Sequence, residues 1–267
     1  SDRQELVAEL DKLNQRIAQA GEQKLINDLQ RQAYEVLLSG GVADALDLSK
    51  EDRATVARYD TIGHSRGDAW NKANRGKKGM YTGHAKAIGK QLLLARRLCE
   101  AGCGFVTIHD GYDGIWDMHA DGNNLNIKDG MDACGPAFDH AVAAFIEDLE
   151  ARGLSDKIML VCCGEMGRTP KINKNGGRDH WGKLSTLMLY GGGIPRGQVL
   201  GQSTRDGGEP AANPVTPKHL ISTILHGLFD VGRLRVTPSL APIAKLAEHA
   251  TIPGDRKSTR LNSSHRT

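Results

Sequence analysis

The residues of this chain best suited to chemistry are acidic and imidazole side chains in two polar loops. In the first loop, Asp117 and His119 stand two residues apart, so in extended backbone both point the same way and can reach one divalent cation. Such a D-x-H pair also occurs in ordinary surface turns, and the nearby Asp110, Asp113 and Asp121 leave the choice of ligand open. The first loop therefore indicates a metal site without defining its ligands.

The second loop adds carboxylate, imidazole and guanidinium groups. Glu165 directly follows an expected strand, and Asp179 and His180 supply a further oxygen and a further nitrogen donor. Together the two loops could build a mixed site suited to Zn²⁺ or Mn²⁺. Arg168 and Arg178 are candidate substrate-binding residues, because planar guanidinium groups bind phosphate or sulfate oxygens in bidentate fashion. The alternative is a salt-bridged loop in which these arginines pair with the acids.

Other catalytic motifs are not found in the sequence. The glycines at 191–193 are not followed by G-K-[ST], which excludes a phosphate-binding P-loop, and no G-x-S-x-G marks a hydrolase nucleophile. The five cysteines form no C-x-x-C pair, so a zinc ribbon and a redox dithiol are both disfavoured. The catalytic nucleophile stays unknown.

Composition limits the class of protein. The chain has 267 residues, of which 39% are hydrophobic, enough for one sizeable core or two modest ones. Its 35 basic and 32 acidic residues give a net charge of +3, too slight to indicate a nucleic-acid partner. The basic run RGKK at 75–78 is more typical of a solvated loop. The apolar runs are too short for a membrane span.

The elements that must position the two loops follow from hydrophobic periodicity. We expect a helical hairpin over 1–40, a short helix over 49–59, a basic loop over 60–80, helices over 84–101 and 137–152, strands over 105–108, 158–163, 184–190 and 199–202, and a helix from Thr216. Alternating strands and helices predict an α/β fold with a mostly parallel sheet flanked by helices, and sites beyond the carboxyl ends of its strands. The expected division is a helical segment with a basic loop (1–80), an α/β domain (81–254) and a disordered or artefactual tail (255–267).

Several motifs in register resemble a known family. The segments FVTIHDGYDGIWDMH, LVCCGEMGRTPKIN, GRDHW, LYGGGIPRGQVLGQS and NPVTPKHLISTILHGL are similar to the DUF1501 family, which is sulfatase-like and placed in the alkaline phosphatase superfamily. The resemblance runs from about residue 1 to residue 250 and is strongest over 90–230. It implies an alkaline-phosphatase-like core, with metal ligands at Asp117, His119, Glu165 and His180, and Asp179 as a ligand or the partner of one.

The same resemblance implies a function. It suggests a hydrolase of phosphate or sulfate esters, small-molecule or polysaccharide, that uses Zn²⁺, Mn²⁺ or Ca²⁺. Relatives carry an early strand with a metal-binding Asp and a Ser, Thr or modified Cys nucleophile, which residues 1–80 do not show. We therefore expect the C-terminal portion of a longer, exported or periplasmic protein, with the nucleophile outside this chain. The alternative is a non-catalytic binding or structural relative.

Overall fold

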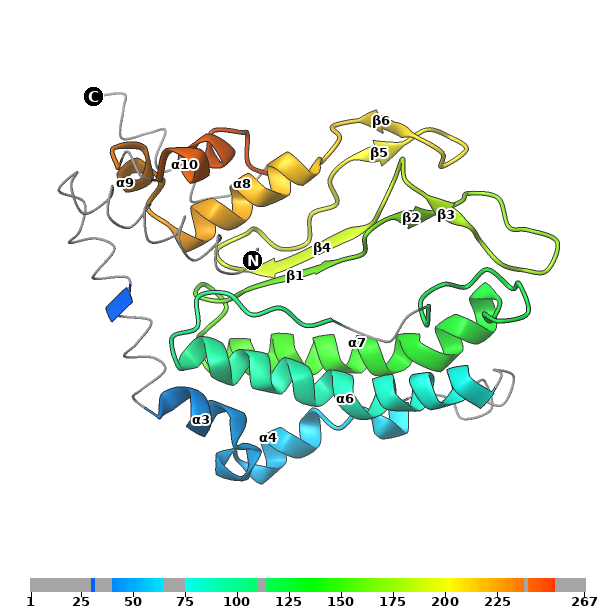
Figure 1. Ribbon diagram of the computed structural model, residues 1–267, viewed down its shortest axis with the longest axis horizontal. Helices are drawn as coiled ribbons and strands as arrows, with labels where there is room; N and C mark the ends of the chain where they lie inside the picture. The colour runs from blue at the N-terminus through cyan, green and yellow to red at the C-terminus, as the bar shows by residue number, and fades with distance from the viewer. Residues whose placement is uncertain (1–29, 32–39, 65–74, 110–113, 238–239, 253–267) are drawn as a thin grey trace, which may run out of the picture. The chain divides into compact units, whose positions relative to one another are not determined.

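The computed structural model describes residues 30–31, 40–64, 75–109, 114–237 and 240–252 (Figure 1). The expected hairpin over 1–40 lies almost entirely outside this part, and so does the tail 255–267. Two compact units are present: Asp44–Val215 makes up most of one, and Thr216–Ile252 belongs with Ser1–Ala43 to the other. Both polar loops lie in the first unit.

Two long helices dominate the unit Asp44–Val215. Its elements in chain order are α3 (Gly41–Leu46, which begins just before the unit), η1 (Leu48–Lys50), α4 (Arg53–Arg58), η2 (Ile62–His64), α6 (Arg75–Glu100), α7 (Ile127–Ala151), β1 (Met159–Cys163), β2 (Gly167–Arg168), β3 (His180–Trp181), β4 (Leu187–Gly191), β5 (Gln202–Ser203) and β6 (Pro210–Ala212). With 26 and 25 residues, α6 and α7 are far longer than any of the strands.

The prediction of an α/β fold with a mostly parallel sheet and an alkaline-phosphatase-like core is wrong. The described residues are mostly helical, and their strands form two-stranded antiparallel sheets that pair β1 with β4, β2 with β3 and β5 with β6. A parallel pair needs a crossover of about a dozen residues or more, usually a helix. The stretch between β1 and β4, all of it described, contains no helix, and the apolar run Phe105–Ile108 before α7 forms no strand. The strand–helix–strand unit of a parallel sheet is therefore missing here.

The individual helices and strands match the sequence predictions better than the pairing of the strands does. The helix expected over 84–101 is present in α6, which begins earlier, so residues 75–80 of the expected basic loop are helical. The helix expected over 137–152 is present in α7, which begins at Ile127 because the Asn126 side chain accepts a hydrogen bond from Asp129 N at 2.9 Å. The strand expected over 158–163 is β1, and the one over 184–190 overlaps β4.

The main core lies along α6 and α7, which run side by side (Figure 1). Ile88, Leu92 and Leu93 of α6 are buried as their spacing predicts, and they belong to one cluster with Phe145 of α7. Gly89 lies where the chain around Tyr59 crosses α6. A Cβ at Gly89 would lie 1.9 Å from the carbonyl oxygen of Tyr59, so this crossing requires glycine.

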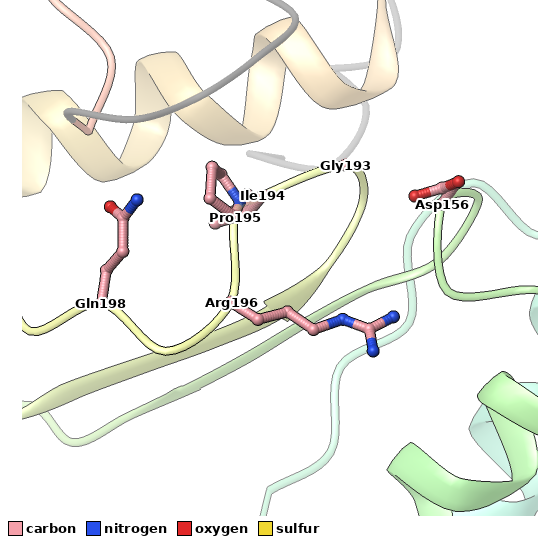
Figure 2. A pocket seen from close by; sticks show the side chains of 6 residues that line it. All are labelled: Asp156, Gly193, Ile194, Pro195, Arg196 and Gln198. Carbon is pink, nitrogen blue, oxygen red and sulfur yellow. The ribbon is translucent and has the colours of Figure 1, made fainter.

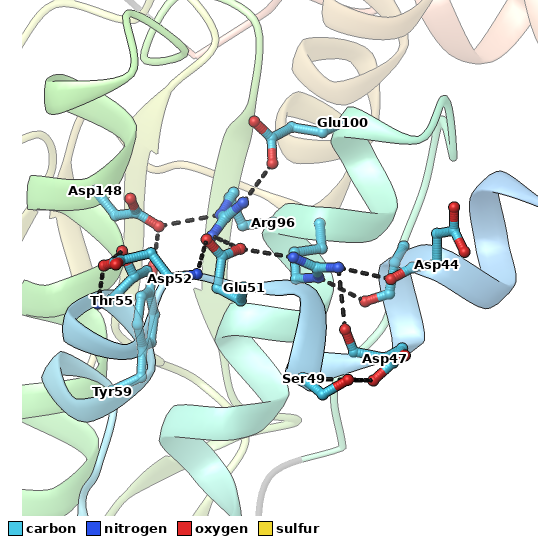
Figure 3. A network of polar contacts seen from close by, with 12 residues as sticks. Asp44, Asp47, Ser49, Glu51, Asp52, Thr55, Tyr59, Arg96, Glu100 and Asp148 are labelled. Carbon is cyan, nitrogen blue, oxygen red and sulfur yellow. Dashed lines mark hydrogen bonds and ion pairs between the residues drawn. The ribbon is translucent and has the colours of Figure 1, made fainter.

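A buried ion network ties α6 and α7 to Glu51, the residue that follows η1 (Figure 3). The Arg96 side chain is only 2% exposed, and its guanidinium contacts Glu51 at 2.6 Å, Asp148 at 3.0 Å and Glu100 at 2.5 Å. Glu51 and Asp148 are themselves 7% and 8% exposed. The Tyr59 hydroxyl also donates to Asp148, at 3.0 Å. Each buried charge therefore has a partner, which is the condition for keeping charges out of water.

We expect Arg96→Ala to lower the free energy of unfolding by about 1.5–3 kcal/mol, because Glu51 and Asp148 lose their most buried cationic partner and keep the contacts that Arg152 makes with both. Urea unfolding followed by circular dichroism measures this. The matched control is Arg58→Ala, which breaks an ion pair with Glu147 in which both side chains are exposed, and should cost less than about 1 kcal/mol. Equal losses in the two variants would contradict a stabilising role for the network.

The network also makes stability depend on pH. Burial alone would raise the pKa of Glu51, but hydrogen bonds from Arg97 and Arg96 outweigh burial and lower it from 4.5 to about 2. A carboxyl group whose pKa is lower in the folded state stabilises the fold above its unfolded pKa. That contribution is lost as the pH falls through the folded pKa.

Between pH 5 and pH 2 we expect Glu51 to account for a loss of about 3 kcal/mol in the free energy of unfolding. Glu51→Gln should be less stable near neutral pH but should show a flatter pH dependence over this range. Urea titrations at a series of pH values compare the two proteins. Parallel pH profiles would contradict the assignment.

The second unit is a small helical cluster in its described part. It contains α8 (Pro217–Leu228), α9 (Val231–Arg235) and α10 (Ala241–Ala247). As the sequence predicts, Thr216 precedes the first turn of α8 and Pro217 opens it. Its core is formed by Val231, Leu234, Ala244 and Ala247. Across both units, no described helix has the length and apolar character needed to cross a membrane.

Candidate metal centre

The first loop is held by two buried apolar residues, one before its candidate ligands and one between them. Ile115 and Met118 are buried with Tyr81 of α6 and Ala133 of α7. Met118 packs so closely on Gly130 of α7 that a Cβ there would lie 2.6 Å from its side chain. With these neighbours turned inward, Asp117 and His119 remain partly exposed, as expected for alternating positions in extended backbone.

The second loop presents Arg168 and His180 side by side. Arg168 in β2 is paired directly with His180 in β3 in an antiparallel register. Residues directly opposite each other in such a pair project from the same face. The pairing needs glycine at position 167, because a Cβ there would lie 1.7 Å from the carbonyl oxygen of Leu184. The short hairpin therefore brings a guanidinium and an imidazole to the same place.

Backbone contacts hold the two loops against each other, and we call this set the inter-loop contact. Arg178 N donates to Met118 O at 3.0 Å, and Asn173 Nδ2 donates to His119 O at 2.8 Å. Gly177 lies directly against the same carbonyl, since a Cβ on it would be 2.0 Å from His119 O. These contacts join segments that are far apart in the sequence and fix how the side chains of one loop face those of the other.

Three of the predicted ligands converge. Asp117 Oδ1 lies 2.9 Å from His180 Nε2 and 3.8 Å from His119 Nε2. The two imidazole centroids are 4.7 Å apart. One ligand atom from each of the three residues lies within 4.8 Å of the others. Two ligands of one tetrahedral Zn²⁺ are about 3.5 Å apart, so small side-chain rotations would bring these atoms to a shared ion.

The neighbours of Asp117 keep its side chain ionised. Partial burial alone would raise the pKa of Asp117, but hydrogen bonds from His180 and Arg168 outweigh it and hold the pKa below its ordinary value. Arg168 Nη2 lies 2.5 Å from the same oxygen, Oδ1. Asp117 is therefore an anion, which is the form that binds metals.

Asp179 lies beside the group as a partner of one ligand. Its Oδ1 is 3.4 Å from His119 Nδ1, while His119 Nε2 faces Asp117. A carboxylate on the far nitrogen of a metal-binding histidine fixes the ring orientation and raises its basicity. Of the two roles left open by the sequence, this geometry favours the partner role.

Glu165 and Arg178 are placed differently from the converging residues. Glu165 is exposed and is not among the three residues whose ligand atoms converge in the described structure. Arg178 donates from Nε to Thr169 O and from Nη2 to Arg168 O, the latter at 3.1 Å. Its guanidinium therefore supports the backbone of the second loop.

Sequence reasoning missed the residues that make the inter-loop contact. Asn173 and Gly177 carry no metal-binding chemistry, and Asn173 acts by donating to His119 O and by accepting from Gly177 N at 2.9 Å. The only local signal was the run N-K-N-G-G, which is typical of a tight turn. Nothing in it identifies the distant segment that the turn contacts.

A pocket of about 560 Å³ lies elsewhere in this unit (Figure 2). It is lined by Asp156, Gly193, Ile194, Pro195, Arg196 and Gln198. Arg196 in it pairs with Glu150 at 2.5 Å and lies over the Tyr190 ring. None of the predicted site residues lines this pocket, so it is separate from the converging Asp and His side chains.

The fold and site define a mostly helical protein with a candidate Asp/His/His cation site. A family model described as a protein of unknown function (DUF1501) matches residues 1–239. The match spans most of the chain, which therefore belongs to the DUF1501 family. Neither a curated protein nor a solved structure shows a significant match. The resemblance drawn from the motifs is confirmed at the level of this family, and the function has to be argued from the site.

Gly177→Ala should disrupt the inter-loop contact, because the added Cβ would overlap His119 O. We expect a loss of about 1–3 kcal/mol in the free energy of unfolding, together with weaker Mn²⁺ binding. The control is Gly182→Ala in the loop after β3, where a Cβ would meet nothing within 4 Å. Urea unfolding and Mn²⁺ titration would compare the variants. If both behave alike, the close approach at Gly177 does not hold the site.

Proposed function

We propose that the chain binds one divalent cation through Asp117, His119 and His180, and that this is the metal site of a phosphate- or sulfate-ester hydrolase. The observation that carries the proposal is the convergence of one carboxylate oxygen and two imidazole nitrogens from loops far apart in sequence. Three protein ligands with a further position open are typical of catalytic rather than structural metal sites.

The donor set favours some cations over others. Two imidazoles and one carboxylate suit Zn²⁺ or Mn²⁺. Ca²⁺ takes 6–8 oxygen ligands, which this group does not offer. Among the cations that the family resemblance implies, Zn²⁺ and Mn²⁺ are therefore our candidates.

The chain's own residues have separate roles in this proposal. Asp117, His119 and His180 hold the cation, and Asp179 orients His119. Arg168 provides positive charge at the edge of the group, where it would bind equatorial oxygens of a phosphoryl or sulfuryl group. A bound divalent cation supplies Lewis acidity and lowers the pKa of an attacking group. The attacking group itself is not assigned among the described residues.

The second candidate is a non-catalytic relative that keeps the cation site. It is favoured by one observation: the Thr169 hydroxyl, which lies beside Asp179, is engaged, because it accepts from Asp179 N at 3.1 Å and donates to Lys171 O at 3.0 Å. The two candidates share the metal ligands and differ in turnover.

Metal binding tests the part that both candidates share. We expect the chain to bind about one equivalent of Zn²⁺ or Mn²⁺, and His180→Ala to weaken binding at least about tenfold, the loss typical of removing even a partner of a ligand. Isothermal titration calorimetry measures both. The control is His64→Ala, which removes an exposed imidazole that stacks on His140 in α7.

A panel of aryl phosphates and aryl sulfates with the metal-loaded, full-length protein then separates the candidates. Turnover that is lost with His180→Ala supports the hydrolase. Cation binding without turnover supports the non-catalytic relative, and no cation binding overturns the proposed site.

A further inference from the structure

We propose that Arg168 and the divalent cation compete for Asp117, so that the site takes up its cation tightly only together with a tetrahedral oxyanion such as sulfate or phosphate. This inference rests on the proposed cation site and adds to it a second ligand and a coupling between the two.

The competition follows from one shared atom. Arg168 Nη2 lies 2.5 Å from Asp117 Oδ1, and His180 Nε2 lies 2.9 Å from the same oxygen. His119 Nε2 is also closest to it, at 3.8 Å. The oxygen best placed to bind a cation beside the two imidazoles is therefore the one that already carries the guanidinium.

A cation on that oxygen would lie close to a positive charge. Metal–oxygen bonds are about 2 Å long, so the cation and Arg168 Nη2 would be at most about 4.5 Å apart. The backbone of Arg168 is held by its pairing with His180 and by the hydrogen bond from Arg178 to its carbonyl, so the guanidinium can turn away from Asp117 but stays near the group. Like charges at this distance and partial burial repel strongly, which weakens cation binding.

The guanidinium also has an unused donor. Arg168 Nη1 is buried and has no hydrogen-bond partner among the described residues. A buried donor without an acceptor is costly, and a planar guanidinium matches two oxygens of a phosphate or sulfate. Once the guanidinium turns away from Asp117, an oxyanion beside the group would accept from Nη1 and would place negative charge between Arg168 and the cation.

The other arginine of the loop does not take this role. Arg178 is held by the carbonyl oxygens of Thr169 and Arg168. Arg168 is thus the residue through which anion and cation binding are coupled, and the coupling must be reciprocal: each ligand tightens the other by the same factor.

The test is Mn²⁺ binding, followed by the electron paramagnetic resonance signal of free Mn²⁺, in chloride and in sulfate at equal ionic strength. With the unaltered chain, we expect sulfate to tighten Mn²⁺ binding about tenfold. Arg168→Gln should bind Mn²⁺ more tightly than the unaltered chain in chloride and should show no effect of sulfate. Arg168→Lys keeps the charge but loses the planar pair of donors, so it should keep weak binding in chloride with a smaller sulfate effect.

Arg205→Gln, at an exposed position before β6, is the charge-matched control and should behave as the unaltered chain. Mn²⁺ binding that is equal in the two salts, or unchanged in chloride by Arg168→Gln, overturns this inference and leaves the proposed cation site standing. If neither the unaltered chain nor Arg168→Gln binds Mn²⁺ in either salt, the cation site itself fails. Circular dichroism of each variant confirms that it is folded.

Discussion

The candidate site depends on one close approach of two backbone segments, the carbonyl of His119 against Gly177. No side chain can occupy that space, because even a Cβ would overlap the carbonyl oxygen. Around this point Arg178 N and Asn173 Nδ2 donate to the carbonyls of the first loop. The convergence of Asp117, His119 and His180 is thus a consequence of backbone packing, and the ligands themselves need only small rotations.

That approach is supported from the helices. Met118, the residue between the two ligands of the first loop, is pressed against Gly130 of α7. α7 in turn packs along α6, and the Arg96 guanidinium joins the two helices through Asp148. The packing of Met118 and the buried Arg96–Asp148 pair determine where the first loop lies. The polar residues at the site therefore do not have to be buried to hold it in place.

The sequence predicted what depends on near neighbours. The periodic apolar residues of α6 and the apolar run of β1 gave correct elements, because helix and strand periods are local properties. Asp117 and His119, which the sequence pairs by their spacing, do lie close together with His180 for the same reason. Strand direction is not local: β1 pairs antiparallel with β4, and Phe105–Ile108, equally apolar, pairs with nothing in the described structure. The contact of Arg168 with Asp117 also joins distant segments. The spacing of residues could not decide whether Arg168 pairs with an acid of the loops or is left to bind substrate.

The buried cluster around Arg96 has a thermal consequence. Water solvates charged groups less favourably as temperature rises, so the cost of keeping Arg96, Glu51 and Asp148 dry falls on heating. The stabilisation that comes from apolar burial increases little over the same temperature range. Added electrolyte acts mainly on charges in contact with solvent and hardly reaches these three. The contribution of this ion network to the stability of the α6–α7 pair therefore becomes relatively larger towards the melting temperature. It depends little on ionic strength.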